Sequence, residues 1–268
     1  PAGSKAVFPP CMETEVGENE RVLFFSDAHL DSQENESARE RTARVLGFLE
    51  YAAKNCETLV ILGDLFDFYF EYRTVFPSRY LRVLSALDGL VRSGVRCFYV
   101  AGNHDFWLGD LFSRTLGVTL VRDGLLLERR GHSPQRVLAA HGDGLGPGDT
   151  GYKILKKILR NPVLIGLFRL IHPDWGYALA RLTSYTSRKY TRRIQPARVE
   201  ASSRTGRALL DSGRGLSAVV LAHTHQPDRR KFETGLYLNC GDWCSHYSFI
   251  RWDGQSLSLE SFEAEHKA

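Results

Sequence analysis

Five short segments of the sequence place metal-ligand side chains directly after apolar runs of the kind that form β-strands. The segments are Ser26-Asp27-Ala28-His29, Gly63-Asp64-Leu65-Phe66-Asp67, Gly102-Asn103-His104-Asp105, His141-Gly142-Asp143 and His223-Thr224-His225. The apolar runs are residues 22–25, 59–62, 97–101, 137–140 and 219–222. Any one of these motifs occurs often by chance, and a single histidine after a strand is usually a hydrogen-bonded structural residue. Five of them in order favour one shared metal site.

Such a set of carboxylate, amide and imidazole ligands can hold two divalent cations roughly 3.5–4 Å apart, which activate water and clamp the attacking and leaving oxygens of a displacement at phosphorus. We expect Asp64 to bridge the two ions. The remaining ligands divide into Asp27, His29 and His225 for one ion, and Asn103, His141 and His223 for the other. Because the set contains oxygen and imidazole nitrogen but no thiolate, it favours Mn²⁺ over a softer metal.

His104 remains outside this ligand set. It directly follows Asn103, so we expect it beside the reacting phosphoryl group, where it can protonate the leaving oxygen or stabilise developing charge. Asp105 comes next in the chain, and we expect its carboxylate to orient the His104 ring, as carboxylates commonly do around metal sites.

The segments between the motifs predict how these side chains are positioned. Residues 37–53 and 78–92 have helical apolar spacing and precede apolar strands, a β-α-β order that brings ligands to the carboxyl ends of strands. Residues 231–262 alternate as in an antiparallel meander. A chain of 268 residues with 43% apolar content can bury one sizeable core. Residues 1–20, rich in Pro, Gly and Glu, predict a loosely held arm.

The order D-x-H, G-D-x-x-D, G-N-H-D, lone H and H-x-H resembles the calcineurin-like metallophosphoesterase superfamily, from about Arg21 to about Asp253. The resemblance implies an α/β fold, a four-layer α-β-β-α sandwich with a helical cap insert. We expect a single domain over residues 21–262, with the insert at about 145–198 and a tail at 263–268. Ala222 stands where this superfamily usually has Gly, so we expect the local turn to differ slightly.

Positive charge is concentrated in the expected insert. From Thr150 to Glu200 there are eleven Lys or Arg and two acids, a local balance of +9, whereas the whole chain is +4. Aliphatic residues are interleaved with these charges. For any one helix of the insert, the simpler interpretation is a helical hairpin that packs on the domain and keeps its charges in water. The concentration of positive charge after His141 instead favours a lid for an amphiphilic substrate with a diphosphate head. Such a lid would also rest on a membrane surface. The scarcity of aromatic residues among the later basic ones argues against nucleic acid as a partner.

Longer stretches resemble a narrower group. These are Asn103-His104-Asp105-Phe106-Trp107, the run H-G-D-G-L-G-P-G-D at 141–149, Gly151-Tyr152-Lys153 and F-R-L-I-H-P-D at 168–174. They are similar to the bacterial UDP-2,3-diacylglucosamine diphosphatases, in particular the branch of Bacteroidetes-like bacteria. The resemblance implies water attack on the diphosphate of a UDP-linked diacyl glucosamine, giving UMP and 2,3-diacylglucosamine 1-phosphate (lipid X) in lipid A biosynthesis. It implies substrate contacts from Asp149, Tyr152, Lys153, Ser187, Arg188 and Lys189.

Two other classes of function stay open. One is a metallophosphoesterase acting on a cyclic nucleotide, a nucleic acid or a phosphoprotein. The other is a scaffold that keeps the fold but binds no metals. All seven ligand positions and His104 carry the expected residues, which argues against a scaffold.

The sequence also predicts where the protein acts. No secretory h-region or transmembrane span is found, and five cysteines without a C-x-x-C motif indicate free thiols in a reducing compartment. We expect a cytoplasmic protein, peripheral on the inner membrane.

Overall fold

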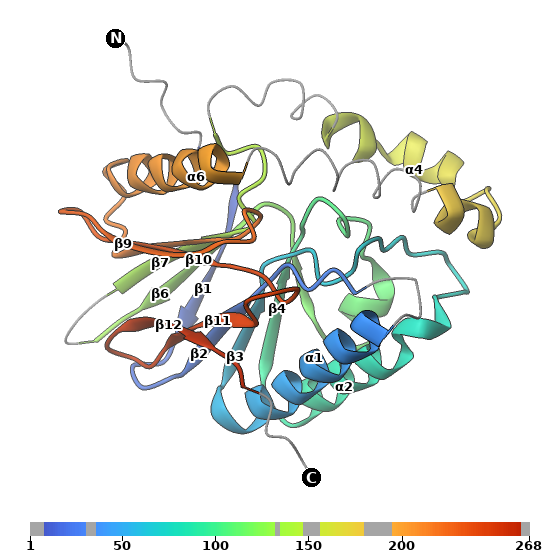
Figure 1. Ribbon diagram of the computed structural model, residues 1–268, viewed down its shortest axis with the longest axis horizontal. Helices are drawn as coiled ribbons and strands as arrows, with labels where there is room; N and C mark the ends of the chain where they lie inside the picture. Colours follow the sequence, from blue (N-terminus) through green and yellow to red (C-terminus); the bar gives the residue numbers. More distant parts are fainter. Residues whose placement is uncertain (1–7, 31–35, 132–134, 147–155, 180–194, 264–268) are drawn as a thin grey trace.

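The computed structural model describes residues 8–30, 36–131, 135–146, 156–179 and 195–263. Two six-stranded sheets face each other, one in the order β1-β6-β7-β8-β10-β9 and the other in the order β12-β11-β2-β3-β4-β5. Helix α6 covers the outer face of the first sheet, and helices α1 and α2 cover the outer face of the second (Figure 1). The predicted α-β-β-α sandwich is therefore confirmed.

The first sheet consists of β1 (Cys11–Val16), β6 (Gly124–Arg129), β7 (Gln135–Ala140), β8 (Ala218–Leu221), β10 (Leu236–Cys240) and β9 (Pro227–Lys231). The second consists of β12 (Leu257–Ser261), β11 (Ser248–Trp252), β2 (Val22–Phe25), β3 (Thr58–Ile61), β4 (Arg96–Val100) and β5 (Thr119–Val121). The helical elements are α1 (Glu36–Asn55), η1 (Ser78–Tyr80), α2 (Leu81–Arg92), η2 (Leu111–Thr115), α4 (Pro162–Phe168) and α6 (Gln195–Leu210). The helices predicted at 37–53 and 78–92 correspond to α1 and to η1 with α2.

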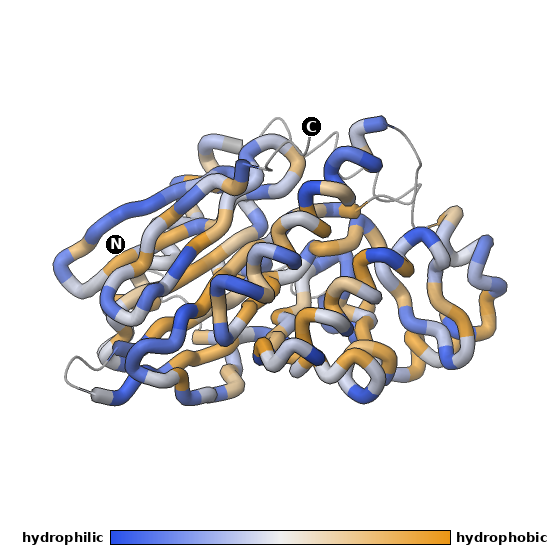
Figure 2. Tube along the Cα trace, turned by 90° about the horizontal axis from the view of Figure 1, so that it is seen from below, coloured by the Kyte–Doolittle hydropathy of each residue, from blue (hydrophilic) through white to orange (hydrophobic). Residues whose placement is uncertain are grey.

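The inner strands β2 and β8 are apolar along their whole length because both of their faces are buried. Successive side chains of a strand point to opposite faces. Phe24 of β2 accordingly packs between the two sheets with Leu127 of β6, whereas Leu23 and Phe25 pack beneath α1 against Phe48. The resulting hydrophobic stretches run through the interior of the molecule (Figure 2). This alternation fixes the strands in register and so fixes the loops that follow them.

The N-terminal segment differs from the predicted loose arm. Cys11–Val16 forms β1, an edge strand that pairs in parallel with β6. Arg129 of β6 holds the following turn, with its Nε donating to the Gly17 carbonyl at 3.0 Å. The strand is polar because one edge and much of its surface face solvent, and its partner lies more than a hundred residues away, so local sequence does not reveal it. The arm is therefore an integral part of the first sheet from residue 11.

The strand-rich end also differs from one continuous meander. β9 and β10 form an antiparallel pair, as do β11 and β12, but β10 pairs in parallel with β8 in the first sheet, whereas β11 pairs with β2 in the second. The chain thus crosses from one sheet to the other between β10 and β11. The five cysteines are free thiols, as predicted.

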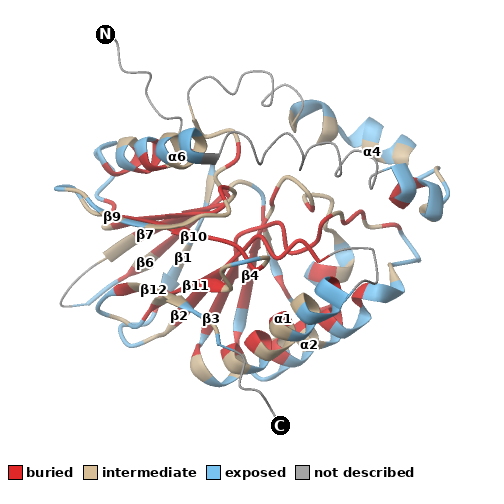
Figure 3. Cartoon of the chain, viewed as in Figure 1, coloured by how far each residue is buried: buried red, intermediate tan, exposed pale blue. Residues whose placement is uncertain are grey.

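The described part of the insert, residues 156–179, lies beyond one end of the sandwich (Figure 1). Asn161 caps α4, with its Oδ1 accepting from the Val163 N–H at 2.9 Å. An aromatic cluster fixes the insert to the domain: Phe168 and Tyr177 pack on Phe70. Most of the insert surface is nevertheless exposed (Figure 3).

Candidate metal centre

The seven predicted ligands lie in loops that follow strands of both sheets. Asp27 and His29 follow β2, Asp64 follows β3, Asn103 follows β4, His141 follows β7, and His223 and His225 follow β8. β2, β3 and β4 are parallel neighbours, as are β7 and β8, so their carboxyl ends meet at one edge of each sheet. The two edges are joined where the His223 backbone N–H donates to Asp27 Oδ2 at 3.0 Å.

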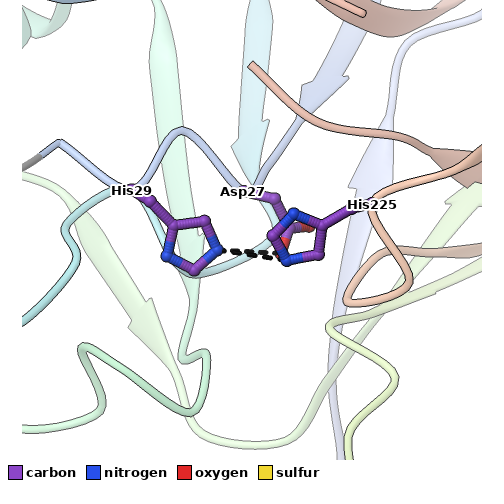
Figure 4. Close-up of side chains that lie close together, drawn as sticks. All are labelled: Asp27, His29 and His225. Atoms are coloured by element: carbon purple, nitrogen blue, oxygen red, sulfur yellow. Dashed lines mark hydrogen bonds and ion pairs between the residues drawn. The ribbon is translucent and has the colours of Figure 1, made fainter. Parts of the chain in front are cut away.

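The first cluster consists of Asp27, His29 and His225 (Figure 4). His29 Nε2 lies 3.3 Å from His225 Nε2 and 3.7 Å from Asp27 Oδ1. Asp27 Oδ1 is 3.5 Å from His225 Nε2. The three side chains come from two sheets and point toward one another, an arrangement that can coordinate one cation.

The second cluster is centred on His141. Its Nε2 lies 3.0 Å from Asn103 Oδ1, 3.2 Å from His223 Nδ1 and 3.5 Å from Asp64 Oδ2. Its Nδ1 donates to the Leu62 carbonyl at 2.7 Å. A hydrogen bond of this kind fixes the ring so that Nε2 faces the other ligand atoms.

Asp64 lies between the two clusters. Its Oδ2 is 3.8 Å from His29 Nε2 and 3.5 Å from His141 Nε2, so one oxygen faces a histidine of each group. Its Oδ1 accepts from the His104 backbone N–H at 2.9 Å. This is the position that a bridging carboxylate requires.

The buried polar atoms fit divalent cations. Asp27 Oδ1 is buried and makes no hydrogen bond within the described part of the chain. A carboxylate oxygen withdrawn from water without a partner is costly, and a cation compensates for that cost. Burial lowers the pKa of His29, and burial together with His141 lowers the pKa of His223 to about 3. Both rings are thus held in the neutral form that binds metal.

His141 responds differently to the same surroundings. Burial disfavours its protonated form, but the Asp64 carboxylate outweighs burial and raises the pKa of His141 to about 10. A carboxylate that stabilises a proton on this ring also stabilises a metal cation beside it. The electrostatics of the second cluster therefore favour positive charge.

Backbone strain is concentrated at the candidate ligands. The residues with positive φ are Asp27 (52°), His29 (42°), Asp64 (52°), His223 (70°) and His225 (60°), and Tyr247 is the one other non-glycine residue of this kind in the described ranges. Each such conformation costs on the order of 1–3 kcal/mol and persists only where the surroundings impose it. The fold therefore bears strain to aim these side chains.

Two glycines allow the central loops to approach each other. A Cβ on Gly63 would lie 2.5 Å from Gly102 Cα, and a Cβ on Gly102 would lie 2.1 Å from Asp64 Oδ1. Both clashes involve atoms that cannot move without displacing Asp64. Ala222, by contrast, is outside the positive-φ set, and its N–H donates to the His141 carbonyl at 3.0 Å. The Cβ at this position is therefore accommodated, and the strain lies on the histidine that follows.

The structure corrects the predicted role of Asp105. His104 Nδ1 is 2.7 Å from the Asp67 carbonyl, so this backbone group orients the ring. Asp105 points into the core, where it accepts from the Asp64 N–H at 3.2 Å and from the Tyr99 hydroxyl. Adjacent side chains diverge here because the loop turns sharply after Asn103. Asp105 thus supports the backbone of the candidate bridging residue and does not contact His104.

Two buried acids near the ligands were not predicted as site residues. Asp242, just after β10, lies with its Oδ2 3.5 Å from His225 Nδ1, and its Oδ1 accepts from the Ser245 N–H at 2.9 Å. Asp143 accepts from Lys156 Nζ at 2.7 Å, which ties the insert to the loop of His141. Asp242 directly follows a strand, as the other site residues do, and this position could have indicated a site residue. Unlike the D-x-H and H-x-H motifs, however, Asp242 has no histidine or carboxylate two residues away.

The predicted substrate contacts lie outside the described residues. These are Asp149, Tyr152, Lys153, Ser187, Arg188 and Lys189. Their assignment stays a prediction from resemblance.

Comparison with known proteins places the chain in a family. Residues 20–227 match the model of the calcineurin-like phosphoesterases. A UDP-2,3-diacylglucosamine hydrolase of Porphyromonas gingivalis is 29% identical over 91% of this chain and 98% of its own length. Proteins of the same name are 30% identical in Pseudomonas savastanoi, over 90% and 96%, and 31% identical in Edwardsiella ictaluri, over 89% and 90%. The chain therefore belongs to the calcineurin-like phosphoesterase family and is a metal-dependent hydrolase.

Proposed function

We propose that this protein hydrolyses the diphosphate of UDP-2,3-diacylglucosamine, releasing UMP and 2,3-diacylglucosamine 1-phosphate (lipid X) for lipid A biosynthesis. The observation that carries this proposal is the end-to-end similarity to relatives named UDP-2,3-diacylglucosamine hydrolase, which extends through the insert as well as the metal loops. The convergence of the seven side chains supports the phosphorus chemistry, and the insert supports the lipid part of the substrate.

Two divalent ions, preferably Mn²⁺, bind at the clusters. Asp27, His29 and His225 would hold one ion, Asn103, His141 and His223 would hold the other, and Asp64 lies where it would serve both. When bound, the ions activate water and stabilise charge on the transferring phosphoryl group. The ligand chemistry favours Mn²⁺, because the set combines carboxylate and amide oxygens with imidazoles.

His104 assists departure of the leaving phosphate. A carbonyl oxygen only accepts, so the contact with Asp67 requires a proton on His104 Nδ1. The other ring nitrogen is then the one that exchanges a proton. His104 shares a cluster with His29 and Asp64, so this exchange takes place beside two of the candidate metal ligands. In its protonated form the ring donates to the leaving oxygen.

The insert provides an apolar surface beside this site. Leu170 is 82% exposed, Trp175 73% and Val163 67%. The insert is anchored next to the His104 loop, because Trp107 Nε1 donates to the Leu159 carbonyl at 3.1 Å. The acyl chains of the substrate lie against this surface. The polar part of the substrate is contacted by the residues that the resemblance implies, namely Asp149, Tyr152, Lys153, Ser187, Arg188 and Lys189.

The same surface brings the enzyme to its membrane-bound substrate. Within the described ranges, no helix has both the length and the hydropathy to cross a bilayer. The exposed side chains of Ile158 and Leu170 directly follow the exposed Lys157 and Arg169 in the chain, a combination that suits the headgroup region of an anionic membrane. We therefore place the protein peripherally on the cytoplasmic face of the inner membrane.

The test is an assay of purified protein with Mn²⁺ against UDP-2,3-diacylglucosamine, with bis-p-nitrophenyl phosphate and a cyclic nucleotide in parallel. We expect UMP release from the lipid nucleotide with a much higher kcat/KM than for the small diesters. Turnover of the small diesters alone would leave the metal chemistry standing and reject the lipid substrate.

A further inference from the structure

Arg198 lies on the first turn of α6, at the point where the insert returns to the domain. Its guanidinium Nη2 is 2.8 Å from Nε2 of His223, and its side chain is half-buried. No carboxylate of the described residues lies within ion-pair distance of Arg198. A half-buried guanidinium beside the outer nitrogen of a candidate metal ligand is well placed to bind an anionic ligand.

The two nitrogens of His223 have different surroundings. Nδ1 is 3.2 Å from His141 Nε2 and faces the second cluster, whereas Nε2 faces Arg198. A neutral imidazole that binds a metal through Nδ1 carries its proton on Nε2. Arg198 is also only a donor. With a metal on Nδ1, two donors therefore face each other, and they must separate to admit an acceptor between them.

Nearby carboxylates are already paired with other cations. Glu200, on the same turn of α6, accepts from Arg230 Nη1 at 2.7 Å. Asp143, beside the His141 loop, accepts from Lys156 Nζ at 2.7 Å. Among the described residues, these acids therefore do not neutralise Arg198, and a phosphoryl oxygen at the metal centre is an acceptor of suitable charge.

We propose that the Arg198 guanidinium and His223 Nε2–H form a two-donor subsite for a non-bridging oxygen of the substrate phosphate. The inference rests on the proposed function only in that His223 must bind metal through Nδ1. It applies to any phosphate substrate and adds Arg198 to the residues that contact the reacting group. Arg198 holds the phosphate from the side of α6, opposite the sheet that carries Asp64.

The test uses full-length, Mn²⁺-loaded protein titrated with inorganic phosphate by calorimetry, with metal content measured on the same samples. The variants are Arg198→Gln, which keeps length and loses charge, Arg198→Lys, which keeps charge, and Arg204→Gln as a control on an exposed position of the same helix. Hydrogen bonds to charged groups predict phosphate binding weakened roughly 10- to 100-fold in Arg198→Gln. Arg198→Lys should lose less, and Arg204→Gln should stay within about twofold of wild type.

The measurements separate this inference from the proposed substrate. Unchanged phosphate affinity in Arg198→Gln, with two ions bound, would overturn the subsite. Loss of one ion from Arg198→Gln would also overturn it, because Arg198 would then serve to hold His223 in place. Wild-type protein that binds phosphate through Arg198 yet releases no UMP from the lipid nucleotide would reject the substrate and leave the subsite standing.

Discussion

The metal loops and the insert differ in how the chain holds them. The loops follow central strands and their side chains are largely buried. A hydrogen bond from the His223 N–H to the Asp27 carboxylate links the loops of the two sheets. The described residues 156–179 of the insert rest on a small aromatic cluster around Phe70 and on polar contacts such as that of Lys156 with Asp143. Packing fixes the metal loops, whereas residues 156–179 of the insert contact the domain mainly through this aromatic cluster and a few polar bonds.

This difference indicates a division of labour. Ligands must be held within fractions of an ångström, so the fold places them in the loops directly after buried strands and accepts strained φ values there. A surface that receives acyl chains needs exposed apolar area instead. Substitutions in the loops should therefore affect every substrate, and substitutions in the insert should affect the lipid substrate alone.

The largest effect is expected from His141→Ala. This change removes the residue at the centre of the second cluster, and we expect turnover of both the lipid nucleotide and bis-p-nitrophenyl phosphate to fall by at least about 100-fold. Circular dichroism should show a folded domain, because the cores of the two sheets are untouched. Near-normal activity with Mn²⁺ would mean that the site is wrongly drawn.

Asp242→Asn should have the next largest effect. Asp242 Oδ2 lies 3.5 Å from His225 Nδ1, and loss of such a partner commonly costs roughly 10- to 100-fold in metal affinity or activity. We expect weaker Mn²⁺ binding by calorimetry and partial rescue of turnover at high Mn²⁺. Asp211→Asn, at the exposed end of α6, is the matched control. Equal Mn²⁺ affinity in both variants would remove Asp242 from the site.

A smaller and selective effect is expected from Arg188→Ala or Lys189→Ala. By the resemblance, both residues contact the substrate, so KM for the lipid nucleotide should rise roughly tenfold, as for loss of one charged contact. The kinetics of bis-p-nitrophenyl phosphate should hardly change. Equal losses on both substrates would show that these residues support the fold or the metals.

The smallest effect is expected from Leu170→Ser in the insert. The side chain is 82% exposed, so the free energy of unfolding should change by no more than about 0.5 kcal/mol. We expect a few-fold loss of activity on the lipid nucleotide in vesicles and none on the small diester. A clear fall in melting temperature would show instead that Leu170 packs against the domain.

The seven predicted ligand side chains do lie together, because each of them follows an apolar strand and the topology brings the strand ends to one place. The sequence did not predict which neighbour a side chain contacts. Asp105 was paired with His104 by adjacency, yet the loop turns its carboxylate to the Asp64 N–H. The strand Cys11–Val16 was missed because its stability depends on distant β6. Local patterns therefore identified the chemistry, and tertiary contacts decided the partners.

The most direct test of the central claim is anomalous diffraction from crystals of the protein grown with Mn²⁺. We predict two peaks roughly 3.5–4 Å apart, one among Asp27, His29 and His225, the other beside His141, with the Asp64 carboxylate between them. A single peak, or peaks away from these residues, would contradict a dinuclear centre built from the five loops.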